Sequence, residues 1–91
     1  MSTAWVIMGE EASIIAVTNC ASKIKPFILR YAERHFSAES TLMIRKQLET
    51  AKFSAKDFRS QTFRGDIDWE FIDVYPEILI TRADHIIGEG A

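Results

Sequence analysis

The sequence contains only one cysteine, Cys20, so no disulfide bond can form within the chain. A lone thiol excludes the disulfide-stapled frameworks of small secreted proteins and favours a reducing compartment. Apolar runs near the ~18 residues of a membrane span are missing as well. The first residues lack the basic charge of a signal peptide, and Glu10 and Glu11 interrupt the apolar stretch that follows. We therefore expect a cytoplasmic protein with no membrane association.

Sequence motifs of enzymes are also missing. The four glycines stand singly or in the C-terminal tail, so no phosphate-binding loop or nucleophile elbow is present. A catalytic thiol needs a base, and a zinc ion needs closely spaced ligands, but Cys20, His35 and His85 are far apart in the chain. We expect no catalytic residue, no cofactor and no bound metal.

What remains is a short chain of ordinary globular composition. Its 91 residues are 47% apolar, which suffices for one hydrophobic core. We expect a single domain over residues 1–91, with a frayed tail at 88–91. A domain of this size has little volume for a deep pocket, so recognition through the surface is favoured over catalysis.

The N-terminal third predicts a hairpin followed by a helix. Residues 4–8 and 13–18 are short β-prone runs on either side of a turn that contains Gly9. Apolar residues then recur at three- and four-residue spacing, as in an amphipathic helix. Pro26 fits only the first turn of that helix, so the helix is expected to start between Ser22 and Pro26.

Two similar segments in the middle of the chain predict two further helix starts. Ser37 and Ser54 each follow a phenylalanine and have the position of an N-cap. Phe53 and Phe58 have the spacing of a hydrophobic staple across such a start. We expect one helix between the two segments and a shorter third helix over residues 55–61.

The C-terminal third predicts two strands. Arg64-Gly65 is the expected end of the helical region, and residues 66–71 then alternate between acidic and large apolar side chains, which is typical of a half-buried strand. Pro76 cannot donate a ladder hydrogen bond, so it ends that strand or places it at an edge. Residues 77–81 are expected to form a fourth strand, although their apolar spacing also suits a short helix.

The order of these elements, β-β-α-α-(α)-β-β, places the helices in the middle of the chain. It predicts an α+β domain in which a small antiparallel or mixed sheet has helices packed on one face. Such a sheet can also leave an edge open, so a homodimer formed through that edge is a further expectation.

Three carboxylates, those of Asp66, Asp68 and Glu70, alternate along the predicted strand. They are the residue type that holds metal ions in nucleases, but same-side neighbours on a strand stand about 6–7 Å apart, too far for one ion without help from another element. A solvent-facing surface explains them more simply. The same strand could also meet a basic groove on another protein. The interface residues that we expect are Asp66, Asp68, Trp69, Glu70, Asp73 and Tyr75.

Basic side chains gather in the first two thirds of the chain. Residues 1–60 carry nine Lys and Arg against six Asp and Glu, whereas residues 61–91 carry two against seven. Basic side chains aligned on helices could contact phosphates. Acidic residues interrupt the series, however, as on an ordinary solvated helix face. The candidates for nucleic-acid contact are Arg30, Arg34, Arg45, Lys52, Lys56 and Arg59.

These features lead to one functional hypothesis and two alternatives. We expect a small non-enzymatic protein that binds and modulates a larger protein partner as an inhibitor, adaptor or accessory regulator. In build alone it resembles the short accessory proteins of phages and other mobile elements, including anti-CRISPR inhibitors of host defence, although no motif carries that resemblance. The first alternative is an accessory protein that binds nucleic acid through a basic helical face. The second is a metal-dependent nuclease built on the three carboxylates.

Overall fold

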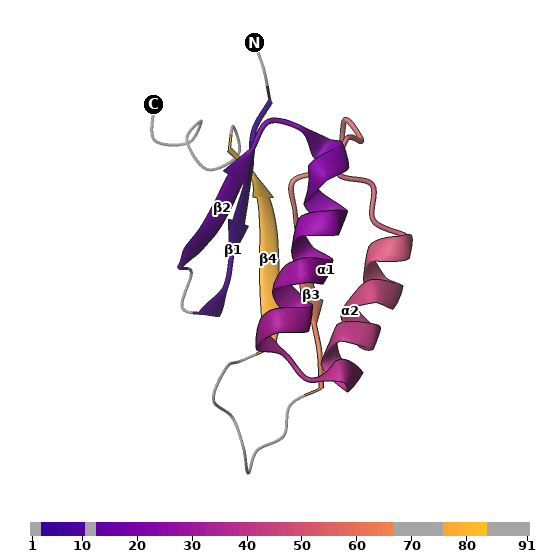
Figure 1. Ribbon diagram of the computed structural model, residues 1–91. Coiled ribbons are helices and arrows are strands. Elements are labelled where there is room, and N and C mark those ends of the chain that lie inside the picture. Colours follow the sequence, from indigo (N-terminus) through magenta and orange to yellow (C-terminus); the bar gives the residue numbers. More distant parts are fainter. Residues whose placement is uncertain (1–2, 11–12, 67–75, 84–91) are drawn as a thin grey trace.

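The computed structural model describes residues 3–10, 13–66 and 76–83 (Figure 1). The predicted α+β class is confirmed, with two helices between two pairs of strands. Along the chain the elements are β1 (Trp5–Met8), β2 (Ile14–Thr18), the 3-10 turn η2 (Ala21–Lys23), α1 (Ile24–His35), α2 (Ala38–Glu49), β3 (Ser60–Arg64) and β4 (Glu77–Arg82).

The four strands form one sheet in the order β2-β1-β4-β3, and every neighbouring pair is antiparallel. The predicted hairpin is β1 and β2. The segment that suits either a strand or a short helix is the strand β4, which lies between β1 and β3. Of the described strands, β2 and β3 are therefore the two edges.

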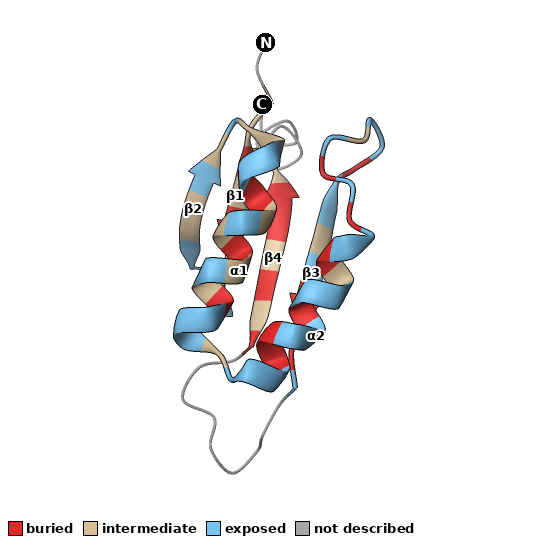
Figure 2. Cartoon of the chain, turned by 45° about the vertical axis from the view of Figure 1, so that its right-hand side comes forward, coloured by how far each residue is buried: buried red, intermediate tan, exposed pale blue. Residues whose placement is uncertain are grey.

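Both helices lie on one face of this sheet, α1 over β1 and β4 and α2 beside β3 (Figure 2). The buried residues lie on the sides of the helices and the sheet that face each other. Burying each large aliphatic side chain contributes about 1.5–3 kcal/mol, so this single core holds the two layers together. Its largest fully buried members are Ile7, Ile24, Ile28, Ile44, Phe63, Ile78 and Ile80.

The predicted starts of the first two helices are confirmed. Pro26 lies in the first turn of α1, where its missing N–H leaves no helical hydrogen bond unmade. At the start of α2, the Ser37 hydroxyl accepts a hydrogen bond from the Ser40 N–H at 3.1 Å. Such an N-cap contributes about 1 kcal/mol, and it fixes the sharp turn between the helices.

The predicted third helix is wrong. Residues 50–59 form turns, and β3 occupies residues 60–64, so Arg64-Gly65 ends a strand and not a helical region. The rings of Phe53 and Phe58 do meet, with centroids 5.4 Å apart, but both are buried in the core of the domain. The two rings therefore touch because of packing in the core, although no helix starts between them. Pairing of residues 60–64 with β4 outweighs the local helix propensity of this segment.

The predicted strand over residues 66–71 lies outside the described residues except for Asp66, and so does the tail at 88–91. In the described part of the chain, neither helix is long and apolar enough to cross a membrane.

Candidate protein-interaction surface

The outer edge of β2 presents backbone hydrogen-bonding groups. The Ala83 N–H donates to the Ala4 carbonyl at 2.8 Å, so even-numbered residues of β1 direct their backbone groups to β4 and odd-numbered residues to β2. Ile7 therefore bonds with its partner Ala16. The N–H and C=O of the next residue, Val17, point away from the sheet.

The side chains of β2 do nothing to protect that edge. Its five residues include no charge and no proline, the two features that most often prevent edge-to-edge pairing. Ile14 and Val17 are 67% and 61% exposed. They pair with Met8 and Val6 on the face of the sheet away from the helices. The only irregularity is a register shift opposite Ile7 and Met8.

The other edge, β3, is closed by α2 at its C-terminal end. The Arg64 N–H donates to the Gln47 Oε1 at 3.0 Å, and the Gln47 Nε2 donates to the Arg64 carbonyl at 2.6 Å. One carboxamide thus takes the place of a neighbouring strand. Two residues later the Ser40 hydroxyl bonds both the Asp66 N–H at 3.0 Å and the Asp66 carbonyl at 3.1 Å.

Charge and close packing strengthen the closure of β3. On the sheet face away from the helices, Arg64 Nε donates to the Glu77 carboxylate at 2.8 Å. The next residue, Gly65, is buried against α2, where an added Cβ would lie only 2.4 Å from the Cβ of Ser40. Only glycine allows so close an approach, and it brings Ser40 within reach of the strand.

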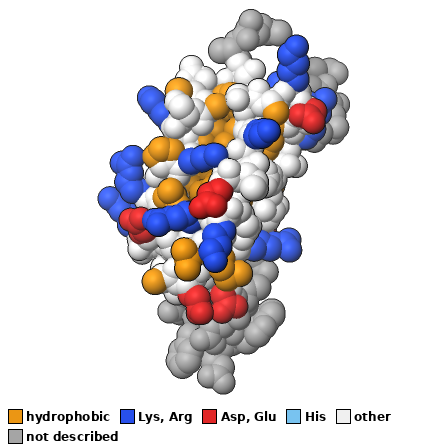
Figure 3. Space-filling model, turned by 90° about the vertical axis from the view of Figure 1, so that its right-hand side faces the viewer, with side chains coloured by type: hydrophobic (Ala, Val, Ile, Leu, Met, Phe, Trp, Pro, Cys, Tyr) orange, Lys and Arg blue, Asp and Glu red, His pale blue; other side chains and the backbone are white. Residues whose placement is uncertain are grey.

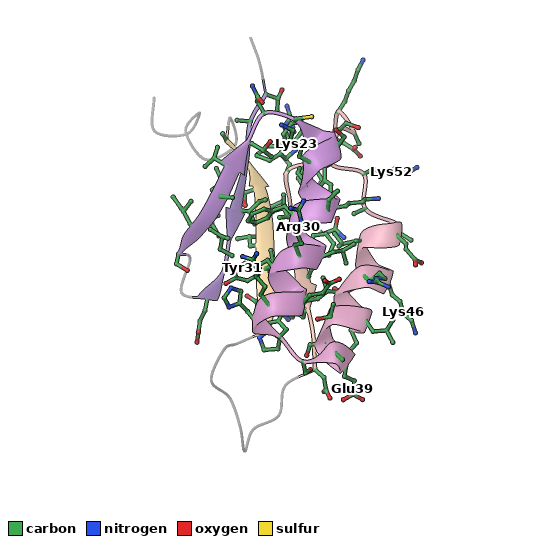
Figure 4. The ribbon with its side chains drawn as sticks, viewed as in Figure 1. Lys23, Arg30, Tyr31, Glu39, Lys46 and Lys52 are labelled. Carbon is green, nitrogen blue, oxygen red and sulfur yellow. The ribbon has the colours of Figure 1, made fainter. Side chains whose placement is uncertain are left out.

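A row of rings runs along the side of α1 that faces β2. Phe27 and Tyr31 are stacked with centroids 6.4 Å apart, and Tyr31 lies 4.4 Å from the ring of His35. Figure 4 shows Tyr31 on the side of α1 toward β1 and β2, whereas Lys46 extends from α2 on the other side. Arg30 and Arg34 join these rings to line a shallow hollow of about 280 Å³.

Most of the acidic interface candidates lie outside the described residues. These are Asp68, Trp69, Glu70, Asp73 and Tyr75. Asp66 is described, and its side chain is exposed at the end of β3 while its backbone bonds Ser40. Within the described ranges, no group of three or more His, Cys, Asp and Glu side chains is placed to hold a metal ion.

The six basic candidates are all exposed, but they do not share one site. Arg30 and Arg34 line the hollow on α1 beside Phe27 and Tyr31. Arg45 lies 3.8 Å from Glu33, between the two helices. The other three, Lys52, Lys56 and Arg59, lie in the connection after α2. Figure 3 shows Lys and Arg side chains on the helical side separated by acidic and apolar ones.

The geometry around Cys20 does not form a thiol–imidazole pair. Cys20 precedes η2, whereas His35 is the last residue of α1, a helix of 12 residues and so about 18 Å long. The hydrogen bond between the Cys20 Sγ and the Ser22 hydroxyl, at 3.1 Å, lowers the pKa of the thiol. Lys23 lowers it further by its charge. The pKa of the thiol is thus lowered by its neighbours Ser22 and Lys23 and not by an imidazole.

No protein-family model, curated protein or solved structure matches the chain. Only the residues and geometry of this chain therefore bear on its function.

Proposed function

We propose that the protein is a non-enzymatic binding domain that adds an extended segment of a larger protein to its sheet at β2. The segment would pair with the outward backbone groups of Val17, and its side chains would lie against the exposed Ile14 and Val17. The sequence led us to expect an inhibitor, adaptor or accessory regulator, and the proposal places its binding surface at the edge of β2. The open, uncharged edge of β2 with its exposed Ile14 and Val17, opposite an edge that α2 closes at one end, is the observation that carries the proposal.

Three further features support a binding role. The exposed apolar side chains of β2 are of the kind that marks contact sites when they are grouped on a surface. Four of the five residues of β2 pair with β1, so the strand is already formed and a partner would lose little conformational entropy of this chain. The described residues also hold no paired nucleophile and base. The unpaired Cys20 thiol suits a reducing compartment, and we keep the cytoplasm as the proposed location.

The experiment uses proline as a probe of the edge. Val17→Pro removes an outward N–H in the middle of the edge and keeps the Ile7–Ala16 pairing, since proline is tolerated where no ladder bond is lost. Thr62→Pro is the matched control on the other edge, because Thr62 is exposed and also directs its N–H away from β4. Circular dichroism would verify that both variants fold.

The readout is quantitative affinity purification from the native cell with each variant as bait. We expect a partner that the wild-type chain and Thr62→Pro retain and that Val17→Pro loses. Reconstitution with that purified partner should then slow amide exchange in β2 and leave β3 unchanged. A partner that binds both variants equally, or a set of captured proteins that does not depend on Val17, contradicts the proposal.

A further inference from the structure

We infer that the protein binds the phosphate group of a phosphate monoester in a shallow hollow between the start of α1 and the connection after α2. The hollow has a volume of about 590 Å³. It is lined by Ala21, Ser22 and Lys25 on one side and by residues 51–55 on the other. None of these residues belongs to β2, so the inference goes beyond the proposed function and does not depend on it.

Lys25 lies in the hollow because of its position on α1. Lys25 and Glu33 each come one position after a buried residue of this helix, so both lie on the same side of it. Glu33 lies 3.8 Å from Arg45 of α2, which shows that this side faces α2. Lys25 is in the first turn, where the neighbour of α1 is the connection after α2. Its side chain is half-buried there, so its range of positions is restricted.

Lys52 supplies a second positive charge from the other side of the hollow. Figure 4 shows its side chain extending outward from the connection after α2. The flexible four-carbon chain of a lysine allows the ammonium group to turn over the hollow when an anion is bound. The residues on either side of Lys52, Ala51 and Phe53, are buried, so the backbone that carries the lysine is anchored in the core.

No carboxylate offsets these two charges in the described part of the chain. The two ion pairs among the described residues involve other side chains, and neither Lys25 nor Lys52 donates a side-chain hydrogen bond there. The acids nearest to Lys52 in sequence, Glu49 and Asp57, are exposed and do not line the hollow. An anion that enters the hollow would therefore meet two ammonium groups that no described carboxylate neutralises.

The donors of the hollow fit a phosphate group better than a carboxylate. Two ammonium groups balance the charge of about −1.5 to −2 that a phosphate monoester carries at neutral pH, and a carboxylate carries less. The three phosphate oxygens also accept hydrogen bonds from several directions, and the hydroxyls of Ser22 and Ser54 add two donors. Ser22 bonds the Cys20 Sγ, whereas the Ser54 hydroxyl has no partner among the described residues. The apolar surface of Ala51 and Phe53 suits the organic part of a monoester.

The test follows the amide signals of the isotope-labelled chain by NMR, at constant ionic strength, during titration with four probes. These are inorganic phosphate, acetate, a phosphoserine peptide and glucose 6-phosphate. We expect phosphate, but not acetate, to shift the signals of residues 22, 25 and 51–55 in a saturable way. The double variant Lys25→Gln/Lys52→Gln should weaken this binding at least about tenfold, because it removes two charge-assisted contacts. Lys46→Gln removes the same type of charge from α2 and should leave the affinity unchanged. The dispersion of each spectrum verifies that the variants fold.

The two organic probes distinguish the sources of the phosphate group. A phosphoserine peptide that binds more tightly than inorganic phosphate indicates a phosphorylated protein, and glucose 6-phosphate that does so indicates a small metabolite. If neither binds more tightly, the hollow holds only the free ion and the inference is wrong. It is also wrong if phosphate causes no saturable shift, or if Lys25→Gln/Lys52→Gln binds as the wild type does. Single-stranded DNA that displaces both organic probes at equimolar concentration would replace the monoester by nucleic acid.

Discussion

The two edges of the sheet are built in opposite ways. At β3, side chains from α2 bond the outward backbone groups of Arg64 and Asp66, so the C-terminal end of this edge is closed by its own chain, while Thr62 directs its N–H outward as Val17 does. At β2, no side chain of the described residues bonds the outward groups of Val17, and the strand is uncharged and apolar. An exposed edge is a hazard that proteins usually remove. This difference between the two edges is the basis of the proposal that a partner pairs with β2.

The largest expected difference between the edges is in stability. Phe63→Ala should lower the free energy of unfolding by about 3–5 kcal/mol, because Phe63 is fully buried in β3 and its loss leaves a cavity in the core. Val17→Ala on β2 should cost less than about 1 kcal/mol, since Val17 is largely exposed. Urea denaturation measures both. Equal losses would mean that β2 is as structural as β3.

The two glycines that follow β1 and β3 give a second comparison. Gly65→Ala should cost about 1–3 kcal/mol, because the new Cβ would overlap the Cβ and backbone of Ser40. Gly9→Ala should cost less, since its Cβ would meet the movable end of the Ile15 side chain at 2.9 Å. Thermal unfolding of both variants tests the order, and a reversed order would show that the contact between β3 and α2 is loose.

Removing the carboxamide that closes β3 should have a smaller effect. Gln47→Ala deletes two hydrogen bonds to Arg64 and should cost about 1 kcal/mol, because water can replace them at this exposed site. Lys46→Ala is the control on the same helix and should be nearly neutral. Unchanged amide exchange at Arg64 in Gln47→Ala would argue against this closure.

The smallest effect concerns Cys20, two residues beyond the end of β2. The thiolate is the reactive form, and the bond to Ser22 lowers the pKa of the thiol, so it increases the reactive fraction at neutral pH. Ser22→Ala should raise that pKa, slow alkylation by iodoacetamide at pH 7 and move the pH midpoint of the reaction upward. Ser54→Ala should leave the rate unchanged. An unchanged midpoint in Ser22→Ala would show that the hydrogen bond is not maintained.

Local signals in the sequence predicted much of the fold. The hairpin, the place of Pro26 in the first turn of α1 and the N-cap at Ser37 each depend on neighbouring residues, and all are confirmed. The prediction of a third helix was wrong because the Phe53–Phe58 spacing is compatible with a helix start and equally with a contact in the core. The strand β3 was missed, since only Phe63 of its five residues is buried and its pairing with β4 is set by tertiary structure.

The site was less predictable than the fold. An open edge was expected, but its assignment to β2 depends on the closing of β3 by Gln47 and Ser40, from a helix well separated in sequence. No local sequence pattern predicts a hydrogen bond between side chains of α2 and the backbone of β3. The separation of the basic residues was equally hard to predict, because Lys56 and Arg59 lie in a connection where the sequence predicted a third helix. The uncharged run of β2 was visible in the sequence, and it is the signal that points to an exposed edge.

Amide hydrogen exchange of the isolated chain, read residue by residue by NMR, tests the contrast between the two edges most directly. The N–H of Val17 should exchange almost without protection, while those of Ala16, bonded to β1, and Arg64, bonded to Gln47, should exchange slowly. A Val17 amide as protected as that of Ala16 in the dilute monomer would contradict the account, because the edge proposed to receive a partner would already be covered.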